Sequence, residues 1–234
     1  MYDLSQITNE AVVRAPRIVL LGGTKVGKST FAAGAPDPIF LPIKREDGID
    51  ELKNIGRTPI CDSFEDVIGW LDFLLKGGHS YKTVVIDSSS TMEPLVHDFT
   101  CKRCENASSI ETVYKGFGKG YTEALTEWRL VMDYLDILRN SQGMTTILIG
   151  HVEAKRFDNP TTDSYDRWRW DINKYADQAI TRWADCILFC DKKAIVRSDD
   201  VGFGKEVKRA IELEPDKRFL FTQSRASHPG GGRG

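Results

Sequence analysis

Residues 17–29 read RIVLLGGTKVGKS, an apolar run followed at once by a glycine-rich turn. The aliphatic and β-branched residues at 18–21 are typical of a buried strand, and a helix can begin at Lys28. The turn at 22–29 fits the pattern G-x-x-x-x-G-K-[ST], which binds phosphate when it joins a strand to a helix. This order of elements therefore predicts a phosphate-binding loop; the alternative is a glycine-rich turn with an incidental lysine.

Each part of this loop has a predicted role in nucleotide binding. Gly22 and Gly27 permit backbone angles and a close approach that a Cβ would obstruct, so successive N–H groups can converge on phosphate oxygens. Lys28 would neutralise the β- and γ-phosphates of ATP, and the hydroxyl of Ser29, in preference to that of Thr30, would bind Mg²⁺. The predicted nucleotide-binding residues are Gly22, Gly23, Thr24, Lys25, Val26, Gly27, Lys28, Ser29 and Thr30.

Short apolar runs alternate with helical patterns along most of the chain, which predicts an α/β fold with a mainly parallel sheet and crossover helices. Helical patterns lie between Ser63 and Gly77 and at 122–139. Turn chemistry after Cys190 favours antiparallel strands that extend the sheet. The expected parallel strands cover 17–21, 39–43, 82–87, 144–150 and 184–190, and the antiparallel ones 193–196, 206–213 and 218–222.

Composition limits the class of protein. The 234 residues carry 32 Lys and Arg against 34 Asp and Glu, and 41% are hydrophobic, as in an ordinary globular chain that is not a polycation. The apolar runs are far shorter than the ~20 residues that span a bilayer, the N-terminus does not resemble a secretory signal, and the cysteines suit a reducing compartment. We therefore expect a cytoplasmic protein without a membrane segment. Its predicted parts are an extension at 1–15, one domain at 16–225 and a disordered Gly-rich tail at 226–234.

Three polar side chains follow predicted parallel strands, at the edge where ligands gather in open α/β sheets. Asp87 would hold Mg²⁺ through water, or else cap the next turn. Glu46 is the preferred base to orient an attacking water, with Asp47 as its alternative; both would otherwise belong to a solvated loop. His151 would sense the γ-phosphate and pass its presence to the connection that follows, unless it is a structural histidine.

The order of these motifs resembles that of the RecA-like core ATPases. More narrowly, the chain resembles the phage RecA-like single-strand annealing proteins of the Sak type, which are AAA-like P-loop NTPases. The segments that carry the resemblance are GGTKVGKST, EDGI, VVIDS, SSIETVYKGFGKGYTEALTEWRLVMDYLDILR, ILIGH and YDRWRWDINKYADQAITRWADCILF.

The resemblance covers residues 16–225 and implies a RecA-like ATPase domain. It implies ATP-dependent binding of single-stranded DNA, annealing or strand exchange, and self-assembly into a filament or ring. It also implies a single-strand-binding protein as a partner. By the resemblance, Lys28 and Ser29 bind the nucleotide, Glu46 is the catalytic glutamate, Asp87 is the metal aspartate and His151 is the switch residue.

Two long connections, at 105–121 and 152–170, are predicted to hold single-stranded DNA, because they occupy the positions of the DNA loops in a RecA-like core. Both combine basic with aromatic residues, and aromatic faces stack bases while Arg and Lys follow phosphates. The alternative for Trp168 and Trp170 is packing in the core. The candidate DNA-binding residues are Lys115, Lys119, Lys155, Arg156, Arg167 and Arg169.

Two further groups have both a functional and an ordinary interpretation. Basic residues near the C-terminus would reach a neighbouring protomer's γ-phosphate in an assembly, or form a solvated face; they are Arg197, Lys205, Lys208, Arg209 and Arg225. Cys101, Cys104 and His97 provide only three of the four ligands of a zinc site, so ordinary thiols are the default.

Two other functions remain open from the sequence. One is a nucleotide-gated adaptor or loader that uses ATP as an assembly switch and hydrolyses it poorly. The other is a small-molecule phosphotransferase. It ranks last because such an enzyme would need an Arg-rich lid, and the sequence shows none.

Overall fold

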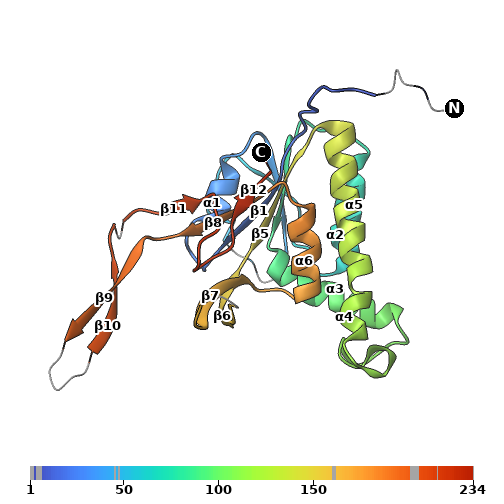
Figure 1. Cartoon of the computed structure of the whole chain (residues 1–234). Coiled ribbons are helices and arrows are strands. Elements are labelled where there is room, and N and C mark those ends of the chain that lie inside the picture. The colour runs from blue at the N-terminus through green and yellow to red at the C-terminus, as the bar shows by residue number, and fades with distance from the viewer. Residues whose placement is uncertain are drawn as a thin grey trace.

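The computed structural model describes residues 3, 7–44, 46, 48–159, 162–200, 206–214 and 216–233, with the backbone alone for 194–200, 206–210 and 212. Its centre is a mainly parallel sheet in the order β11-β8-β1-β5-β4-β2-β3 (Figure 1). The strands are β11 (Phe219–Phe221), β8 (Cys186–Asp191), β1 (Arg17–Gly22), β5 (Thr145–Gly150), β4 (Thr83–Asp87), β2 (Pro38–Pro42) and β3 (Gly56–Arg57).

The position of β1 decides which strand ends meet. It lies between β5 and β8, and β5 separates it from β4, all four running parallel. The register pairs Leu21 with Gly150 and Asp87 with Ile149, so the chain leaves β1, β4 and β5 at the same edge. This order confirms the predicted α/β class with a mainly parallel sheet, and each predicted parallel strand is present.

Both faces of the sheet are buried, because adjacent residues of each strand enter different apolar clusters. On β1, Val19 and Leu21 belong to a cluster that also includes residues of the long helices. Leu20 belongs to the other cluster, together with Ala32 of the helix that follows the phosphate loop. Strands covered on both faces read as continuous apolar runs, which is why the sequence revealed them. The helices of the first cluster lie together on one side of the sheet in Figure 1, and α1 (Lys28–Ala33) lies on the other.

The predicted helices form largely where expected. Ser63 caps α2 (Phe64–Leu75) in a capping box with Asp66, an arrangement that contributes about 1 kcal/mol. The pattern at 122–139 corresponds to a short α4 (Lys119–Glu123) followed by α5 (Leu125–Gln142). Among the described residues, no helix is long and apolar enough to cross a membrane.

One long helix, α3 (Ser89–Arg103), was not predicted. It follows the aspartate strand directly and begins with a capping box between Ser88 and Thr91. Its interior contains Pro94, a residue that normally argues against a helix. Met92, Leu95 and Val96 are nonetheless buried on one face, so packing overrides the local signal.

The connection at 152–170 is more ordered than the sequence suggests. It contains a hairpin of two six-residue strands, β6 (Val152–Phe157) and β7 (Tyr165–Trp170), which leads into α6 (Lys174–Trp183). The hairpin projects beyond the edge where β5 ends (Figure 1). It therefore begins beside His151, at the same edge as the phosphate loop.

The prediction that all the C-terminal antiparallel strands extend the sheet was wrong for two of them. In the described residues, β9 (Ala194–Asp200) and β10 (Glu206–Glu212) pair with each other as a separate ribbon. Figure 1 shows this ribbon standing away from the domain. Of the three predicted antiparallel strands, β11 alone pairs with β8.

The prediction of a disordered tail at 226–234 was also wrong for its described residues, 226–233. The segment β12 (Gly231–Gly232) pairs with β8, and His228 is buried and stacked on Phe189 with 4.3 Å between ring centroids. Glycine gave a signal of flexibility in the sequence, whereas here Gly230 allows a close approach to the backbone of Gln223, from which a Cβ would lie 2.7 Å away. The tail is thus part of the sheet edge.

Candidate nucleotide-binding site

The phosphate loop begins at the end of β1, where Gly22 lies close to Cys190 of β8. A Cβ placed on Gly22 would lie 2.4 Å from the carbonyl oxygen of Cys190, so only glycine permits this approach. Gly27 has a φ of 94°, in the left-handed region that favours glycine, and a Cβ there would lie 2.9 Å from the Arg218 side chain. Both glycines of the sequence motif are therefore required by the backbone.

Lys28 is buried at the centre of the loop. Its amine donates to the carbonyl oxygens of Gly22 at 3.0 Å and Gly23 at 2.6 Å, and lies 3.5 Å from His151 Nδ1. Burial lowers the pKa of Lys28, and the negative charges of Asp87 and Glu46 partly oppose that effect. The amine is thus placed where it can exchange loop carbonyls for phosphate oxygens.

Ser29 and Asp87 form a compact pair of oxygen ligands. Ser29 Oγ donates to Asp87 Oδ2 at 2.6 Å, and the Asp87 side chain is buried. Burial raises the pKa of Asp87 even though the Ser29 hydrogen bond acts in the opposite direction, so this carboxylate would gain from a nearby cation. A hydroxyl and a carboxylate beside a phosphate loop fit Mg²⁺, which takes few protein ligands and completes its shell with water and phosphate. Ser29 and Asp87 are the residues that would hold it.

Glu46 lines the same cavity as Ser29 and Asp87, and its carboxylate accepts hydrogen bonds from two side chains. Ser88 Oγ donates to Glu46 Oε1 at 2.7 Å, and His151 Nε2 donates to the same oxygen at 2.9 Å. Burial alone would raise the pKa of Glu46, but these hydrogen bonds outweigh it and hold the pKa below its ordinary value. The carboxylate is therefore ionised and oriented, as a base that positions water must be. Asp47, its alternative, lies outside the described residues.

These side chains line one cavity of about 340 Å³. Sequence reasoning placed most of its lining correctly, since Lys28, Ser29, Glu46, Asp87 and His151 all meet there. It missed Arg218, which enters from the segment between β10 and β11. The lining residues are Thr24, Lys25, Gly27, Lys28, Ser29, Thr30, Glu46, Gly48, Asp87, His151 and Arg218.

A second cavity, of about 520 Å³, lies between the β6–β7 hairpin and α6. Three of the predicted DNA-binding residues line it: Arg156, Arg167 and Arg169. The two tryptophans differ, because Trp170 is 1% exposed in the core whereas Trp168 is 37% exposed. The core interpretation therefore holds for Trp170, and Trp168 keeps a free aromatic surface.

The tail engages the same hairpin. Arg167 Nη2 donates to Ser224 Oγ at 3.1 Å and to the His228 carbonyl at 3.2 Å, and Trp168 N donates to the Ser227 carbonyl at 2.8 Å. Lys155 pairs with Glu153 on the hairpin itself. Arg167 is thus already bonded by its own chain, while Arg156 is exposed.

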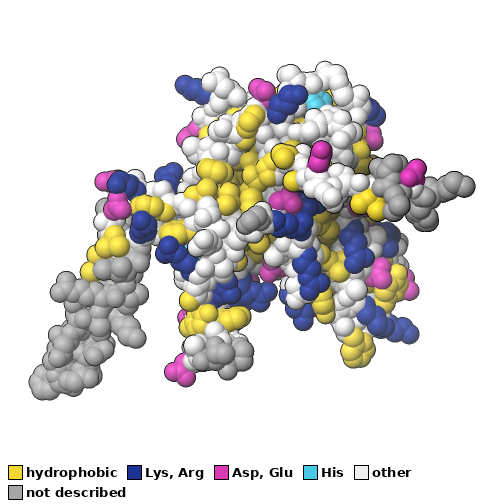
Figure 2. All heavy atoms as spheres, turned by 45° about the horizontal axis from the view of Figure 1, so that its top comes forward, with side chains coloured by type: hydrophobic (Ala, Val, Ile, Leu, Met, Phe, Trp, Pro, Cys, Tyr) yellow, Lys and Arg dark blue, Asp and Glu magenta, His cyan; other side chains and the backbone are white. Residues whose placement is uncertain are grey.

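The other predicted DNA loop carries an aromatic residue that the sequence analysis did not single out. Phe117 is 96% exposed between Lys115 and Lys119, which are also exposed. Its neighbours Gly116 and Gly118 have positive φ angles, so the chain turns sharply around it. In the face drawn in Figure 2, Lys and Arg side chains lie among hydrophobic ones and form no single basic band.

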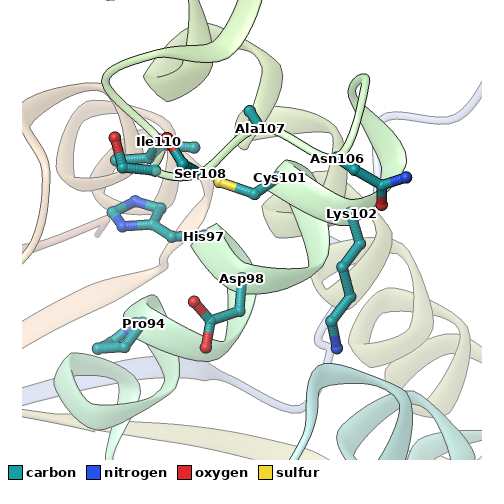
Figure 3. Close-up of a pocket in the computed structure, with 10 residues that line it drawn as sticks. Pro94, His97, Asp98, Cys101, Lys102, Asn106, Ala107, Ser108 and Ile110 are labelled. Carbon is teal, nitrogen blue, oxygen red and sulfur yellow. The ribbon is translucent and has the colours of Figure 1, made fainter.

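A pocket beside the C-terminal half of α3 contains part of the CKRC motif (Figure 3). His97, Asp98, Cys101 and Lys102 line it together with residues 106–110, and Cys104 is buried nearby. In the part of the chain that the structure describes, no three His, Cys, Asp or Glu side chains are placed to hold a metal ion. The cysteines are free thiols.

The basic C-terminal candidates do not reach the cavity as far as they are described. Arg225 lies over the Phe221 ring at 4.7 Å. Lys205 and the side chains of Arg197, Lys208 and Arg209 lie outside the described residues.

Comparison with known proteins gives a family match over nearly the whole chain. A family model described as "AAA domain" matches residues 14–233. No match was found among curated proteins. Among solved structures, the chain is similar to one described as the crystal structure of the RadB recombinase, with 16% identity, a TM-score of 0.45, and coverage of 89% of this chain and 88% of that chain.

Proposed function

Because this chain belongs to the AAA domain family, whose members are P-loop nucleotide-binding proteins, we propose that it binds and hydrolyses Mg-ATP to control its assembly on single-stranded DNA. The observation that carries the ATPase part is Glu46. It is a half-buried carboxylate that Ser88 and His151 orient, and it lines the same cavity as Lys28 and Asp87. A loop that only bound phosphate would not need it.

The residues divide the chemical work. Lys28 would leave the carbonyls of Gly22 and Gly23 and donate to the phosphates, which stabilises the charge that develops on them. Glu46 would accept a proton from water aimed at the terminal phosphorus, and His151 holds the carboxylate in place for this step. Mg²⁺, when bound, supplies positive charge for the phosphates, and Ser29 and Asp87 would hold it.

Single-stranded DNA is the proposed polymer partner. The support is that exposed aromatic and basic side chains occur together at two loops, Phe117 with Lys115 and Lys119, and Trp168 with Arg156. The half-buried Arg169 lines the cavity beside the second loop. Base stacking on aromatic rings and phosphate contacts from Lys and Arg give binding without sequence preference. Annealing of strands, a filament or ring, and cooperation with a single-strand-binding protein are parts of the same proposal.

Two substitutions test the ATPase. Lys28→Ala should remove most ATP binding, measured by equilibrium titration, and unchanged affinity would contradict the assignment of the loop. Glu46→Gln keeps the shape and should lower turnover by ~10²–10⁴ while ATP still binds. If the unaltered protein already turns over negligibly and Glu46→Gln changes nothing, the chain is instead a nucleotide-gated adaptor.

The DNA part has its own test. ATP turnover and electron micrographs are compared with and without single-stranded DNA and a nonhydrolysable ATP analogue. Stimulated turnover or filaments and rings on DNA support the proposal. If single-stranded DNA changes neither turnover nor assembly in any nucleotide state, this part of the proposal is wrong.

A further inference from the structure

Arg218 lies against the phosphate loop although it comes from near the other end of the chain. An ideal Cβ on Gly27 would be 2.9 Å from Arg218 Nη1, 3.4 Å from Cδ and 3.8 Å from Cζ. The aliphatic part and the guanidinium thus both lie along the backbone of the loop at Gly27. The same side chain lines the cavity that contains Lys28, Ser29 and Asp87.

The sheet fixes this position. Arg218 directly precedes β11, whose Phe219 pairs with Asp191 and whose Leu220 pairs with Cys190 on β8. Cys190 in turn pairs with Gly22, the first residue of the loop. Two ladders of backbone hydrogen bonds therefore connect Arg218 to the loop, and a side chain on such elements is held more precisely than one on a free loop.

The Arg218 guanidinium has no polar partner among the residues that the structure describes. Among the described residues, Arg218 forms no hydrogen bond or ion pair, whereas the nearby Lys217 pairs with Glu214. The acidic groups of the cavity are occupied elsewhere, Asp87 by Ser29 and Glu46 by Ser88 and His151. An arginine is always charged and presents a planar fork of donors that matches phosphate oxygens.

We propose that Arg218 binds the phosphate chain of the nucleotide held by its own protomer. The inference rests on the proposed nucleotide site and adds to it a cation from the same chain. It differs from the expectation that basic residues of this region act on a neighbouring protomer's nucleotide.

The test measures how ATP and inorganic tripolyphosphate, each with magnesium, displace a fluorescent ATP analogue. Arg218→Ala should weaken both competitors by the same factor, about 10- to 100-fold, because a charge-assisted contact to phosphate is lost. Arg218→Lys should recover part of the loss. The control is Arg225→Ala, which removes a cation near the same strand that lies over Phe221 and does not line the cavity. Arg218 is exposed, so its substitution disturbs no core, and thermal melting checks that the variants are folded.

Two results would overturn the inference: unchanged affinity for both competitors, or weaker binding of ATP with tripolyphosphate unaffected, which would place Arg218 on the base or sugar. Lys28→Ala separates this failure from failure of the nucleotide site. If Lys28→Ala abolishes binding and Arg218→Ala changes nothing, only the role of Arg218 is wrong.

Mixing the two variants tests whether the arginine acts within its own protomer. Lys28→Ala protomers keep Arg218 but lack a working loop, and Arg218→Ala protomers have the loop but lack the arginine. If the arginine acts within its own protomer, the mixture should show no more high-affinity nucleotide-binding sites than the two variants show when measured separately. Recovery of tight binding on mixing would show that the arginine comes from a neighbour and would overturn the proposal.

Discussion

Glu46 and His151, 105 residues apart in sequence, meet through a hydrogen bond of 2.9 Å from His151 Nε2 to Glu46 Oε1. The backbone of His151 is equally engaged, because its N–H donates to Ser90 Oγ and its carbonyl accepts from the N–H of Asp171. The hairpin β6–β7 begins and ends at these contacts. One residue thus connects the carboxylate of the cavity with the base of the proposed DNA-binding hairpin.

His151→Ala should therefore uncouple DNA from turnover. Glu46 loses one of its two donors, and the hairpin loses its side-chain connection to the cavity. Lys28 loses a 3.5 Å contact but keeps its bonds to the carbonyls of Gly22 and Gly23, and Ser29 keeps its bond to Asp87. We expect ATP to bind nearly as before, basal turnover to fall roughly 10-fold or more, and stimulation by single-stranded DNA to disappear. His79→Ala is the control, since His79 bonds to the Leu74 carbonyl away from the cavity. Stimulation that survives in His151→Ala would contradict the connection.

The two hairpin tryptophans should give opposite results. Trp170→Ala removes a ring that is 1% exposed and should cost about 3–5 kcal/mol of unfolding free energy in urea. Trp168→Ala should leave stability nearly unchanged and weaken binding to a fluorescent single strand by about 10-fold, since base stacking contributes ~1–3 kcal/mol per base. If Trp168→Ala binds the strand as tightly as the unaltered protein, Trp168 is not a stacking surface.

Asp185 holds three separate parts of the fold together. Its carboxylate accepts from Arg17 on β1 at 2.9 Å and from Arg139 on α5 at 3.0 Å, and its backbone carbonyl accepts from the N–H of Arg233 in the tail. Asp185→Ala would leave the largely buried Arg139 without its carboxylate partner and Arg17 with Asp136 alone. It should destabilise the fold by about 3–5 kcal/mol, measured by chemical unfolding. The exposed pair of Lys44 and Asp62 provides the control, because Asp62→Ala should cost under about 1 kcal/mol. Equal effects of the two substitutions would argue against the role of Asp185.

Glu93 should make stability depend on pH. Burial raises its pKa from 4.5 to about 7, although its carboxylate accepts from the backbone N–H of Asn173. Below pH 4.5 both states hold the proton; as pH rises to about 7 the unfolded chain ionises first, so the stabilising contribution is lost over this window.

Glu93→Gln keeps the acceptor and cannot ionise. It should match the unaltered protein near pH 4.5 and exceed it at pH 8 by up to about 3 kcal/mol. Glu65→Gln, at an exposed position in the first turn of α2, is the control and should track the unaltered protein at each pH. Parallel stability curves for Glu93→Gln and the unaltered protein would mean that Glu93 is ionised in the fold.

The sequence analysis predicted which side chains meet in the cavity at the phosphate loop, because these residues follow buried strands. The apolar runs of such strands are easily recognised, and their ends must meet in a parallel sheet. Lys28, Asp87, Glu46 and His151 each came from such a strand end. Arg218 did not, because its position depends on the pairing of β11 with β8, a contact between distant segments that leaves no local pattern.

Segments with conflicting local signals were harder to predict. Pro94 obscured α3, and the glycines of the tail suggested disorder where Gly231 and Gly232 pair with β8. The sequence also could not predict that β9 and β10 form a ribbon apart from the sheet. Apolar and polar residues alternate with the same period in an isolated hairpin as in a strand at the edge of a sheet.

β8 is flanked on one side by β1 and on the other by two short antiparallel segments, with β11 beside its C-terminal half and β12 beside its N-terminal half. The unpaired amides and carbonyls of this border are thereby largely consumed within one molecule, which guards against runaway strand-to-strand aggregation. Two copies of the chain that meet at this border would therefore contact each other through side chains, because β8 offers them no free strand edge.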